Sequence, residues 1–334
     1  PASETIMGSV ARGAAADVEA AVVAARTGFE AWSGLAPKDR EAVLLRAAEI
    51  MAAEGEQRYL EQLIDESGST INKARFEINY TVDLLRTAAG EVRRLYGETF
   101  PNDSPERMSM VIREPLGVVA VVSPYNAPLA LLAKMAAFPL AAGNAVVIKP
   151  SEETPLIAIA LGKLLVEAGL PAAAISVIPG FGVECGATLV EHPQVNGIAL
   201  TGSTQTGMNI GAAGMQRMVR MQLELGGKSA LLVLKDFDPR KAAEIAAAGM
   251  FNHAGQICMA NSRVVVEQAI FDDFCHELKS VCEAMSLGEL RNTDTAYGPV
   301  INRRALDKVQ AHQLQALAAG AVLLTGGAVQ EGLV

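Results

Sequence analysis

The chain contains 334 residues, of which 50% are hydrophobic and 19% are charged. This composition predicts a folded protein with a large core and excludes a disordered chain. The 28 basic and 37 acidic residues give a formal net charge of −9, so nothing here indicates a nucleic-acid or membrane partner. The length predicts about two domains.

The cysteines and the N-terminal residues predict a cytoplasmic protein. Only four cysteines are present, and none has a CxxC or Cys/His ligand spacing. We therefore expect neither a disulfide framework nor a metal site, and a reducing compartment. The first ten residues show no basic segment followed by an apolar run, as a signal peptide would. The most apolar stretch, 118–140, is interrupted by Lys134 and three prolines.

The first hundred residues show helical spacing of apolar side chains. Helices are expected over 17–32, 37–54, 56–65 and 72–95. The last of these is expected to point Phe76, Tyr80, Leu84 and Leu85 inward. Residues 97–114 combine turn residues with a strand-like run at 108–112, which predicts an extended arm or hairpin.

From Gly117 onward, short apolar runs alternate with helical patterns. Strands are expected at 118–123, 145–149, 175–178, 197–201, 218–224, 229–234 and 263–267. Helices are expected at 129–140, 155–168, 184–191, 204–213, 240–252 and 271–285. This alternation predicts an α/β fold with a doubly wound, Rossmann-like parallel sheet.

Two glycine-rich turns follow predicted strands. Gly202-Ser203-Thr204-Gln205-Thr206-Gly207 opens a helix, where backbone N–H groups and the helix dipole favour a phosphate. A tight turn with a Ser or Thr cap explains this segment equally well. The second turn, 179–186, contains Gly182 and is ambiguous alone, because turn geometry also explains its glycines.

Polar residues follow two other strands. Lys149 and Glu152 stand where a parallel sheet binds ligands, and their side chains suit ribose hydroxyls, although a surface ion pair is an equal alternative. Pro124-Tyr125-Asn126 follows the strand before. The Asn126 amide is able to donate to a developing oxyanion, but Asn and Pro are also ordinary turn residues.

A carboxylate and a thiol complete the set. Glu224 precedes Leu225-Gly226-Gly227, and Cys258 lies in Gly255-Gln256-Ile257-Cys258-Met259-Ala260. A thiol nucleophile and a carboxylate base are what covalent catalysis followed by hydrolysis requires. The alternatives are a solvated strand-end Glu224 and a Cys258 that is a small buried hydrophobic residue.

Five motifs, in this order, resemble the NAD(P)-dependent aldehyde dehydrogenase superfamily. They are Pro-Tyr-Asn-Ala-Pro, Lys-Pro-Ser-Glu, Gly-Ser-Thr-x-x-Gly, Glu-Leu-Gly-Gly-Lys and Gly-Gln-x-Cys. Each motif is weak alone, but the ordered set is specific and covers essentially the whole chain. Members usually have Trp where Tyr125 stands and Phe where Leu200 stands, which keeps bulk at both positions.

The resemblance implies that Cys258 is the nucleophile, Glu224 the base and Asn126 an oxyanion donor. It also implies NAD as cofactor, since a Glu at position 152 bonds a free 2′-hydroxyl and repels a 2′-phosphate. The cofactor-binding residues expected on this basis are Pro124, Tyr125, Lys149, Glu152, Gly182, Gly202, Ser203, Gly207 and Leu225. No metal is expected.

The resemblance further implies a cofactor-binding domain over 1–225 and a catalytic domain over 226–334 that is incomplete, because the family continues beyond the position of Val334. Residues 97–115 would be an oligomerisation arm of a homodimer or homotetramer. The Cys258 segment is similar to bacterial aromatic-aldehyde members of the benzaldehyde, vanillin and salicylaldehyde type. Semialdehyde oxidation and an inactive nucleotide-binding fragment remain as alternatives.

Overall fold

The computed structural model describes residues 1–329, which divide into two compact units. The first, called the sheet unit here, comprises Val10–Tyr59 and Glu77–Leu225. The second, called the cysteine unit because it contains Cys258, comprises Pro1–Ser9, Leu60–Phe76 and the chain from Gly226 onward. The two units are defined by how compactly their residues pack and not by what they bind. The functional division into a cofactor-binding domain over 1–225 and a catalytic domain over 226–334 therefore stays a prediction.

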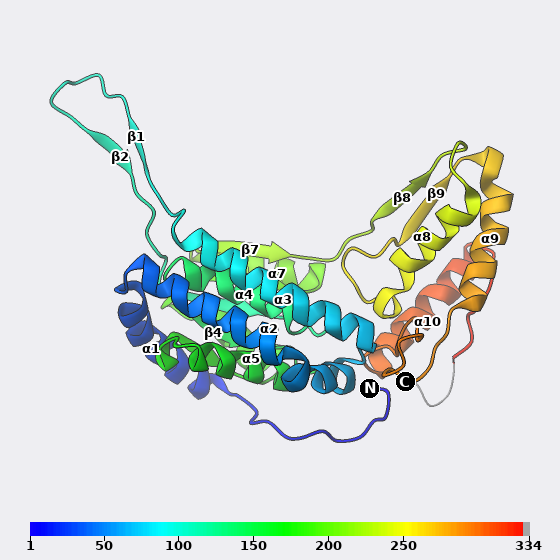
Figure 1. Cartoon of the computed structure of the whole chain (residues 1–334), viewed down its shortest axis with the longest axis horizontal. Coiled ribbons are helices and arrows are strands. Elements are labelled where there is room, and N and C mark those ends of the chain that lie inside the picture. Colours follow the sequence, from blue (N-terminus) through cyan, green and yellow to red (C-terminus); the bar gives the residue numbers. More distant parts are fainter. Residues whose placement is uncertain (330–334) are drawn as a thin grey trace. The chain divides into compact units, whose positions relative to one another are not determined.

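Three helices open the chain, α1 (Ala15–Ser33), α2 (Pro37–Ser67) and α3 (Ile71–Val92) (Figure 1). The prediction of two helices over 37–65 was wrong, since α2 is continuous. A Cβ at Gly55 would lie 2.6 Å from Ile78 Cγ2, so the glycine that suggests a break instead permits close packing of α2 on α3. Glycine weakens a helix without ending it.

The inward face of α3 differs from the prediction. Leu84 and Leu85 are buried as expected, but Phe76 is 64% exposed and Tyr80 is 41% exposed. The buried stripe of the helix instead runs through Ala74, Ile78, Thr81, Val82, Leu85, Ala88 and Ala89. Spacing alone allowed more than one stripe on this helix, and packing against the neighbouring elements selected one of them.

The centre of the sheet unit is a five-stranded parallel sheet in the order β5-β4-β3-β6-β7, which confirms the predicted fold class. The strands are β3 (Val118–Val122), β4 (Ala145–Lys149), β5 (Ile175–Val177), β6 (Val195–Thr201) and β7 (Arg220–Glu224). The connecting helices are α4 (Ala130–Ala141), α5 (Pro155–Glu167), α6 (Ala187–Glu191) and α7 (Thr204–Gln216).

Helices pack closely against the central strands. The α1 helix packs against β3, β4 and β5, whereas α4 packs against β3, β4 and β6 (Figure 1). All five residues of β4 are buried, as expected for a parallel strand covered on both faces. Because the strand order reverses beside β3, the sheet has a switch point between β3 and β6, where ligands bind in such folds.

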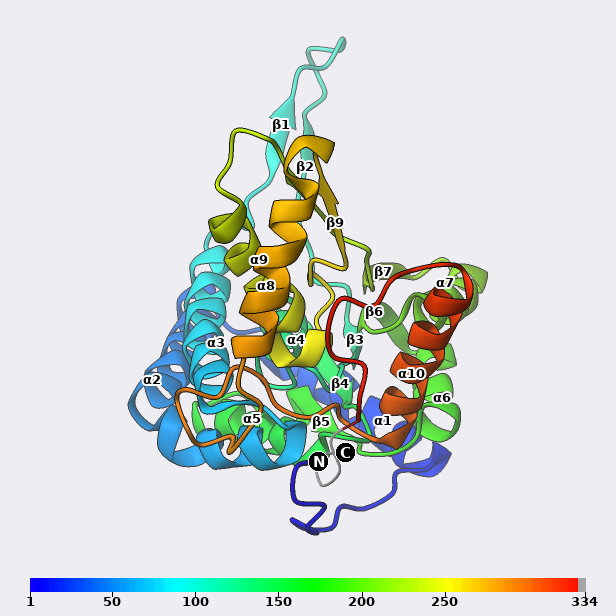
Figure 2. The ribbon, with the colours of Figure 1, turned by 90° about the vertical axis from the view of Figure 1, so that its right-hand side faces the viewer.

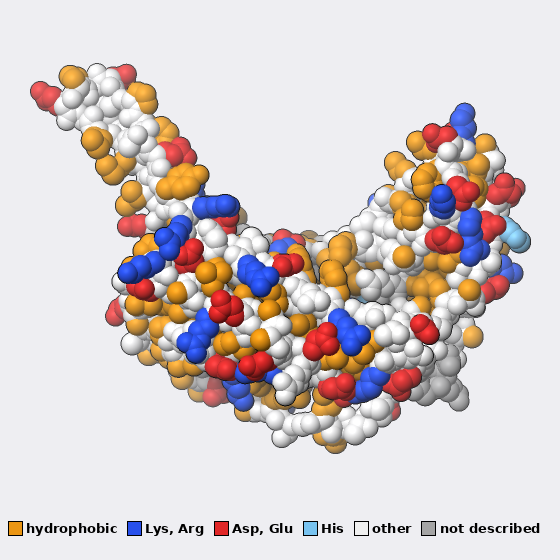
Figure 3. All heavy atoms as spheres, in the orientation of Figure 1, with side chains coloured by type: hydrophobic (Ala, Val, Ile, Leu, Met, Phe, Trp, Pro, Cys, Tyr) orange, Lys and Arg blue, Asp and Glu red, His pale blue; other side chains and the backbone are white. Residues whose placement is uncertain are grey.

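The arm predicted at 97–114 is an antiparallel hairpin of β1 (Glu98–Phe100) and β2 (Ser109–Val111). It projects from the body of the sheet unit (Figure 1) and carries hydrophobic side chains on its surface (Figure 3). Phe100, Met108 and Met110 are 46%, 78% and 58% exposed. Its assignment as an oligomerisation arm stays a prediction.

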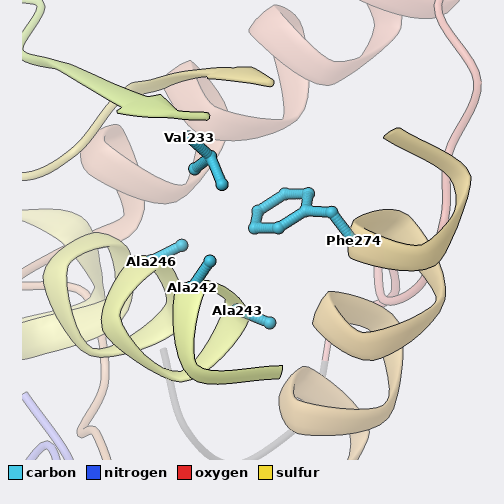
Figure 4. Close-up of a cluster of buried hydrophobic side chains, with 5 residues drawn as sticks. All are labelled: Val233, Ala242, Ala243, Ala246 and Phe274. Atoms are coloured by element: carbon cyan, nitrogen blue, oxygen red, sulfur yellow. The ribbon is translucent and has the colours of Figure 1, made fainter. Parts of the chain in front are cut away.

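The cysteine unit has a small parallel pair of strands, β8 (Ala230–Val233) and β9 (Arg263–Val266). Its helices are α8 (Pro239–Phe251), α9 (Phe271–Ala284) and α10 (Arg303–Ala318), with α8 and α9 packed side by side (Figure 2). Between β8 and these two helices lies a small buried cluster of Val233, Ala242, Ala243, Ala246 and Phe274 (Figure 4). Among the described residues, no helix is long and apolar enough to cross a membrane.

Two glycines in helices are expected to respond oppositely to alanine. A Cβ at Gly28 in α1 would lie 2.2 Å from the carbonyl carbon of Ala173, whereas nothing lies within 4 Å of a Cβ at Gly90 in α3. Gly28→Ala should lower the free energy of unfolding by roughly 1–3 kcal/mol through overpacking. Gly90→Ala should raise it by about 0.5–1 kcal/mol through helix propensity.

Urea denaturation of both variants checks this contrast. Equal effects at the two positions would show that the close approach of α1 to Ala173 does not limit the residue at position 28.

Candidate functional site

The carboxyl ends of four neighbouring strands carry the predicted polar residues of the sheet unit. In the sheet register Val122 lies beside both Lys149 and Leu200, and Thr201 lies beside Glu224. Asn126 follows β3, Glu152 follows β4 and Ser203 follows β6. The parallel sheet therefore brings the five predicted residues, Asn126, Lys149, Glu152, Ser203 and Glu224, to one edge.

Lys149 and Glu152 form an ion pair at this edge. The distance from Lys149 Nζ to Glu152 Oε2 is 2.9 Å, and the side chains are 5% and 44% exposed. A nearly buried ammonium group needs such a partner. The sequence left a surface ion pair as the alternative; an ion pair is present, but its ammonium group is buried and only its carboxylate is partly exposed.

Ser203 caps the helix that follows β6. Its Oγ accepts a hydrogen bond of 3.1 Å from the Thr206 N–H and lies 2.8 Å from Thr206 Oγ1. The N–H of Gly202 donates to the Glu224 carbonyl oxygen at 3.0 Å, which ties this turn to the end of β7. The helix α7 has 13 residues, so its N-terminus presents a full helix dipole.

Two predicted cofactor-binding residues have a packing role. A Cβ at Gly207 would lie 2.4 Å from Leu225 Cδ2, so glycine lets the Leu225 side chain pack directly against α7, and a larger residue there would make that side chain move. A contact of Gly207 or Leu225 with a cofactor stays a prediction.

The second glycine-rich turn is held by the N-terminal segment. Gly182 begins a π-helical turn, η2 (Gly182–Gly186), and no atom lies within 4 Å of a Cβ built on it. Arg12 donates to Glu184 through Nε, at 2.8 Å from Oε2, and through Nη2 to Oε1, and its guanidinium lies 4.9 Å from the centroid of the Phe181 ring. This guanidinium holds the pKa of the Glu184 carboxyl below its usual value. Arg12 therefore anchors this turn at Glu184, and the space next to the Gly182 Cα is open.

The segment between β3 and α4 contains Pro124, Tyr125 and Asn126, all partly buried. Burial, followed by the negative charge of Glu153, raises the pKa of the Tyr125 hydroxyl. Tyr125 therefore remains a neutral hydrogen-bond donor at physiological pH.

The structure places one further residue, Lys134, beside the predicted site. In the sequence this lysine was notable only because it interrupts an apolar stretch. Its Nζ lies 3.6 Å from Glu224 Oε1, so α4 directs a cation at the predicted base. A single lysine within an otherwise apolar helix was the available signal. Both side chains are partly exposed, so the pair orients Glu224 more than it stabilises the fold.

Cys258 lies in the cysteine unit with an exposed free thiol, which excludes the buried-hydrophobe alternative. The loop before it is strained at His253 and Ala254, which have φ of 52° and 54°, because only glycine, as at the next position, Gly255, adopts such values readily. The Gln256 side chain tethers the loop: Nε2 donates to the Pro299 oxygen at 3.3 Å, and Oε1 accepts from Ile301 N–H at 2.9 Å.

His253 is buried and 3% exposed, and neither ring nitrogen forms a hydrogen bond. Burial, and secondarily the charge of Lys73, lowers its pKa well below the usual value. Within residues 1–329, no three His, Cys, Asp or Glu side chains are grouped to hold a metal ion.

A model of the family described as "Aldehyde dehydrogenase family" matches residues 1–333. The chain therefore belongs to the aldehyde dehydrogenase family. It is 38% identical over 335 residues to phenylacetaldehyde dehydrogenase of Pseudomonas fluorescens, covering 98% of this chain and 66% of that protein. It is 33% identical over 331 residues to the NADP(+) succinate-semialdehyde dehydrogenase GabD of Escherichia coli K12, covering 99% and 68%.

Solved structures agree with the fold. The structure of PnpE in complex with nicotinamide adenine dinucleotide superposes with a TM-score of 0.95 at 34% identity, covering 99% of this chain and 68% of that one. The chain thus spans about two thirds of the length of the relatives it matches.

The buried His253 predicts a pH dependence of stability. Because its folded pKa lies below the unfolded value of about 6.5, the unfolded chain takes up a proton first as pH falls. This stabilising contribution is complete above about pH 6.5 and is lost below it, by up to about 1.4 kcal/mol per pH unit.

His253→Asn should reduce this slope, and asparagine tolerates the left-handed backbone. Urea unfolding at pH 7, 6 and 5 measures it, with the exposed His312→Asn as control. An unchanged slope in His253→Asn would contradict the assignment.

Proposed function

We propose that this protein oxidises an aldehyde to a carboxylic acid with NAD. The observation that carries the proposal is the sheet edge, where Asn126, Lys149, Glu152, Ser203 and Glu224 follow or end adjacent parallel strands. Membership of the aldehyde dehydrogenase family and an exposed thiol at Cys258 support it.

In the proposed reaction the Cys258 thiolate attacks the aldehyde carbon, and the carbonyl π electrons move to oxygen. The Asn126 side-chain amide and the Cys258 backbone N–H donate to this oxyanion. The bound nicotinamide supplies the hydride acceptor, so the tetrahedral adduct becomes a thioester on Cys258. Glu224 then takes a proton from water, the water oxygen attacks the thioester, and the thiolate leaves with release of the acid.

The residues at the sheet edge fit the cofactor. The Lys149 ammonium and the exposed Glu152 carboxylate are a donor and an acceptor suited to ribose hydroxyls, and the α7 N-terminus behind Ser203 suits a pyrophosphate. A carboxylate at position 152 disfavours a 2′-phosphate by charge, which supports NAD over NADP.

Glu152→Gln should lower the preference for NAD. We expect the ratio of kcat/KM with NAD to kcat/KM with NADP to fall by roughly tenfold or more, since a hydrogen bond to a charged group is worth about 1.5–3 kcal/mol. Steady-state assays with both cofactors measure it, and Glu191→Gln, an exposed carboxylate elsewhere on the sheet unit, is the control. An unchanged ratio would remove Glu152 from cofactor selection.

For the substrate we propose an apolar, aromatic aldehyde. Ile257 and Met259 flank the thiol, and Met259 is 70% exposed, which offers apolar surface beside the reacting atom. Phenylacetaldehyde dehydrogenase is among the relatives, which supports an aromatic substrate. Similarity to a succinate-semialdehyde dehydrogenase favours the second candidate, a semialdehyde.

The test is NADH production with benzaldehyde, a short aliphatic aldehyde and succinate semialdehyde. We expect benzaldehyde to give the highest kcat/KM. Cys258→Ala should abolish turnover with all three while the Kd for NAD, measured by calorimetry, stays within about twofold, because the thiol is needed only for covalent chemistry.

Substantial turnover by Cys258→Ala would overturn the mechanism. Turnover only with the semialdehyde would replace the aromatic assignment. Cofactor binding without turnover of any aldehyde by the unmodified protein would favour the remaining alternative, a nucleotide-binding fragment without activity.

A further inference from the structure

Glu77 is a buried carboxylate that joins two helices of the sheet unit. It lies on α3 with only 2% of its surface exposed. Its Oε1 accepts hydrogen bonds from the backbone N–H groups of Leu129 and Ala130, at 2.7 and 3.2 Å. These two residues stand at the start of α4, 52 and 53 positions away in the chain.

The first turn of α4 depends on this carboxylate because the chain supplies no cap of its own. The N-cap residue is Leu129, whose side chain accepts no hydrogen bond, and the preceding Pro128 has no N–H. A negative charge at a helix N-terminus also interacts favourably with the helix dipole. Glu77, on α3, therefore accepts the N-terminal hydrogen bonds of α4, which a Ser or Asp at the N-cap position accepts in many helices.

The same turn holds the Asn126 backbone. The carbonyl oxygen of Ala127 accepts a 3.0 Å hydrogen bond from the Leu131 N–H, so α4 fixes the peptide that follows Ala127, one residue beyond Asn126, and Glu77 fixes the start of α4. A shift of the helix start would move the Asn126 amide with it.

We propose that Glu77 is a positioning residue that places Asn126 for oxyanion stabilisation. This inference rests on the proposed function, since it concerns the same reaction. Glu77 itself touches neither substrate nor cofactor in this assignment. It acts through the backbone of residues 127–130.

The effect should appear in kcat. Removing an oxyanion donor typically costs 10²–10³-fold in kcat, so Asn126→Ala should show a loss of that order. Displacing the donor without removing it should cost less, and we expect Glu77→Ala to lower kcat by about 10–100-fold. The Kd for NAD should change much less than kcat, because Lys149, Glu152 and Ser203 stand at other strands and only Pro124 and Tyr125 of the expected cofactor residues share the segment of Asn126.

Two conservative variants separate positioning from folding. Glu77→Gln keeps an oxygen acceptor at the same reach and should retain most of kcat. Glu77→Asp keeps the charge but withdraws the acceptor by one methylene, and should lower kcat although it is the smaller chemical change. Thr81→Val is the matched control, because it removes a buried hydrogen bond on the same helix, from Thr81 Oγ1 to the Glu77 carbonyl at 2.8 Å, and should leave kcat unchanged.

The double variant Glu77→Ala/Asn126→Ala gives the decisive measurement. If Glu77 acts through Asn126, the double variant should have the kcat of Asn126→Ala alone, since a missing donor cannot be displaced. A general structural role would instead multiply the two losses. All rates are measured on the full protein, below the unfolding transition of every variant.

The outcomes distinguish a failure of the proposed function from a failure of the positioning role of Glu77 alone. If Asn126→Ala retains full turnover, or the unmodified protein turns over no aldehyde, the proposed function fails and the positioning role falls with it. If Asn126→Ala is impaired but Glu77→Ala and Glu77→Asp are not, or if the losses multiply in the double variant, only the positioning role is overturned.

Discussion

Parallel strand pairing is the constraint on which the rest of the sheet unit depends. Parallel strands end at one edge, and the observed register places Lys149 beside Val122 and Glu224 beside Thr201. Residues from Asn126 to Glu224, dispersed along about a hundred positions of the chain, are thereby gathered because the strands that carry or precede them pair directly. Helices cover the apolar strands and so bury them. The parallel sheet with its covering helices therefore forms the hydrophobic core and also places the candidate site residues at one edge.

The α4 helix connects this edge to the body of the unit. Glu77 holds its N-terminal backbone, and the fully buried Trp32 donates from Nε1 to the Leu140 carbonyl at 2.8 Å near its other end. A helix fixed at both ends moves little, so Asn126 before it and Lys134 within it occupy defined positions. Preorganisation of this kind is what electrostatic stabilisation of a transition state requires.

The Cys258 loop is built on a different principle. It has three successive left-handed residues, of which His253 and Ala254 are not glycine, and a tether through Gln256. Backbone strain of this kind costs of order 1–3 kcal/mol for each non-glycine residue and persists where surrounding contacts hold it. Cys258 is thus an exposed, free cysteine that follows a strained turn.

The sequence by itself determined the parallel sheet, the family and most of the elements, because strand runs, helical spacing and turn residues are local patterns and the five motifs occur in order. It did not indicate α10. It did not determine which stripe of α3 is buried, that α2 continues through Gly55, or that Lys134 meets Glu224 and Glu77 meets Leu129. These features depend on side chains that are distant in the chain and become neighbours only after folding. The periodicity of a segment predicts that one of its faces is buried. Which face is buried, and which distant residues it contacts, is decided only when the elements pack together.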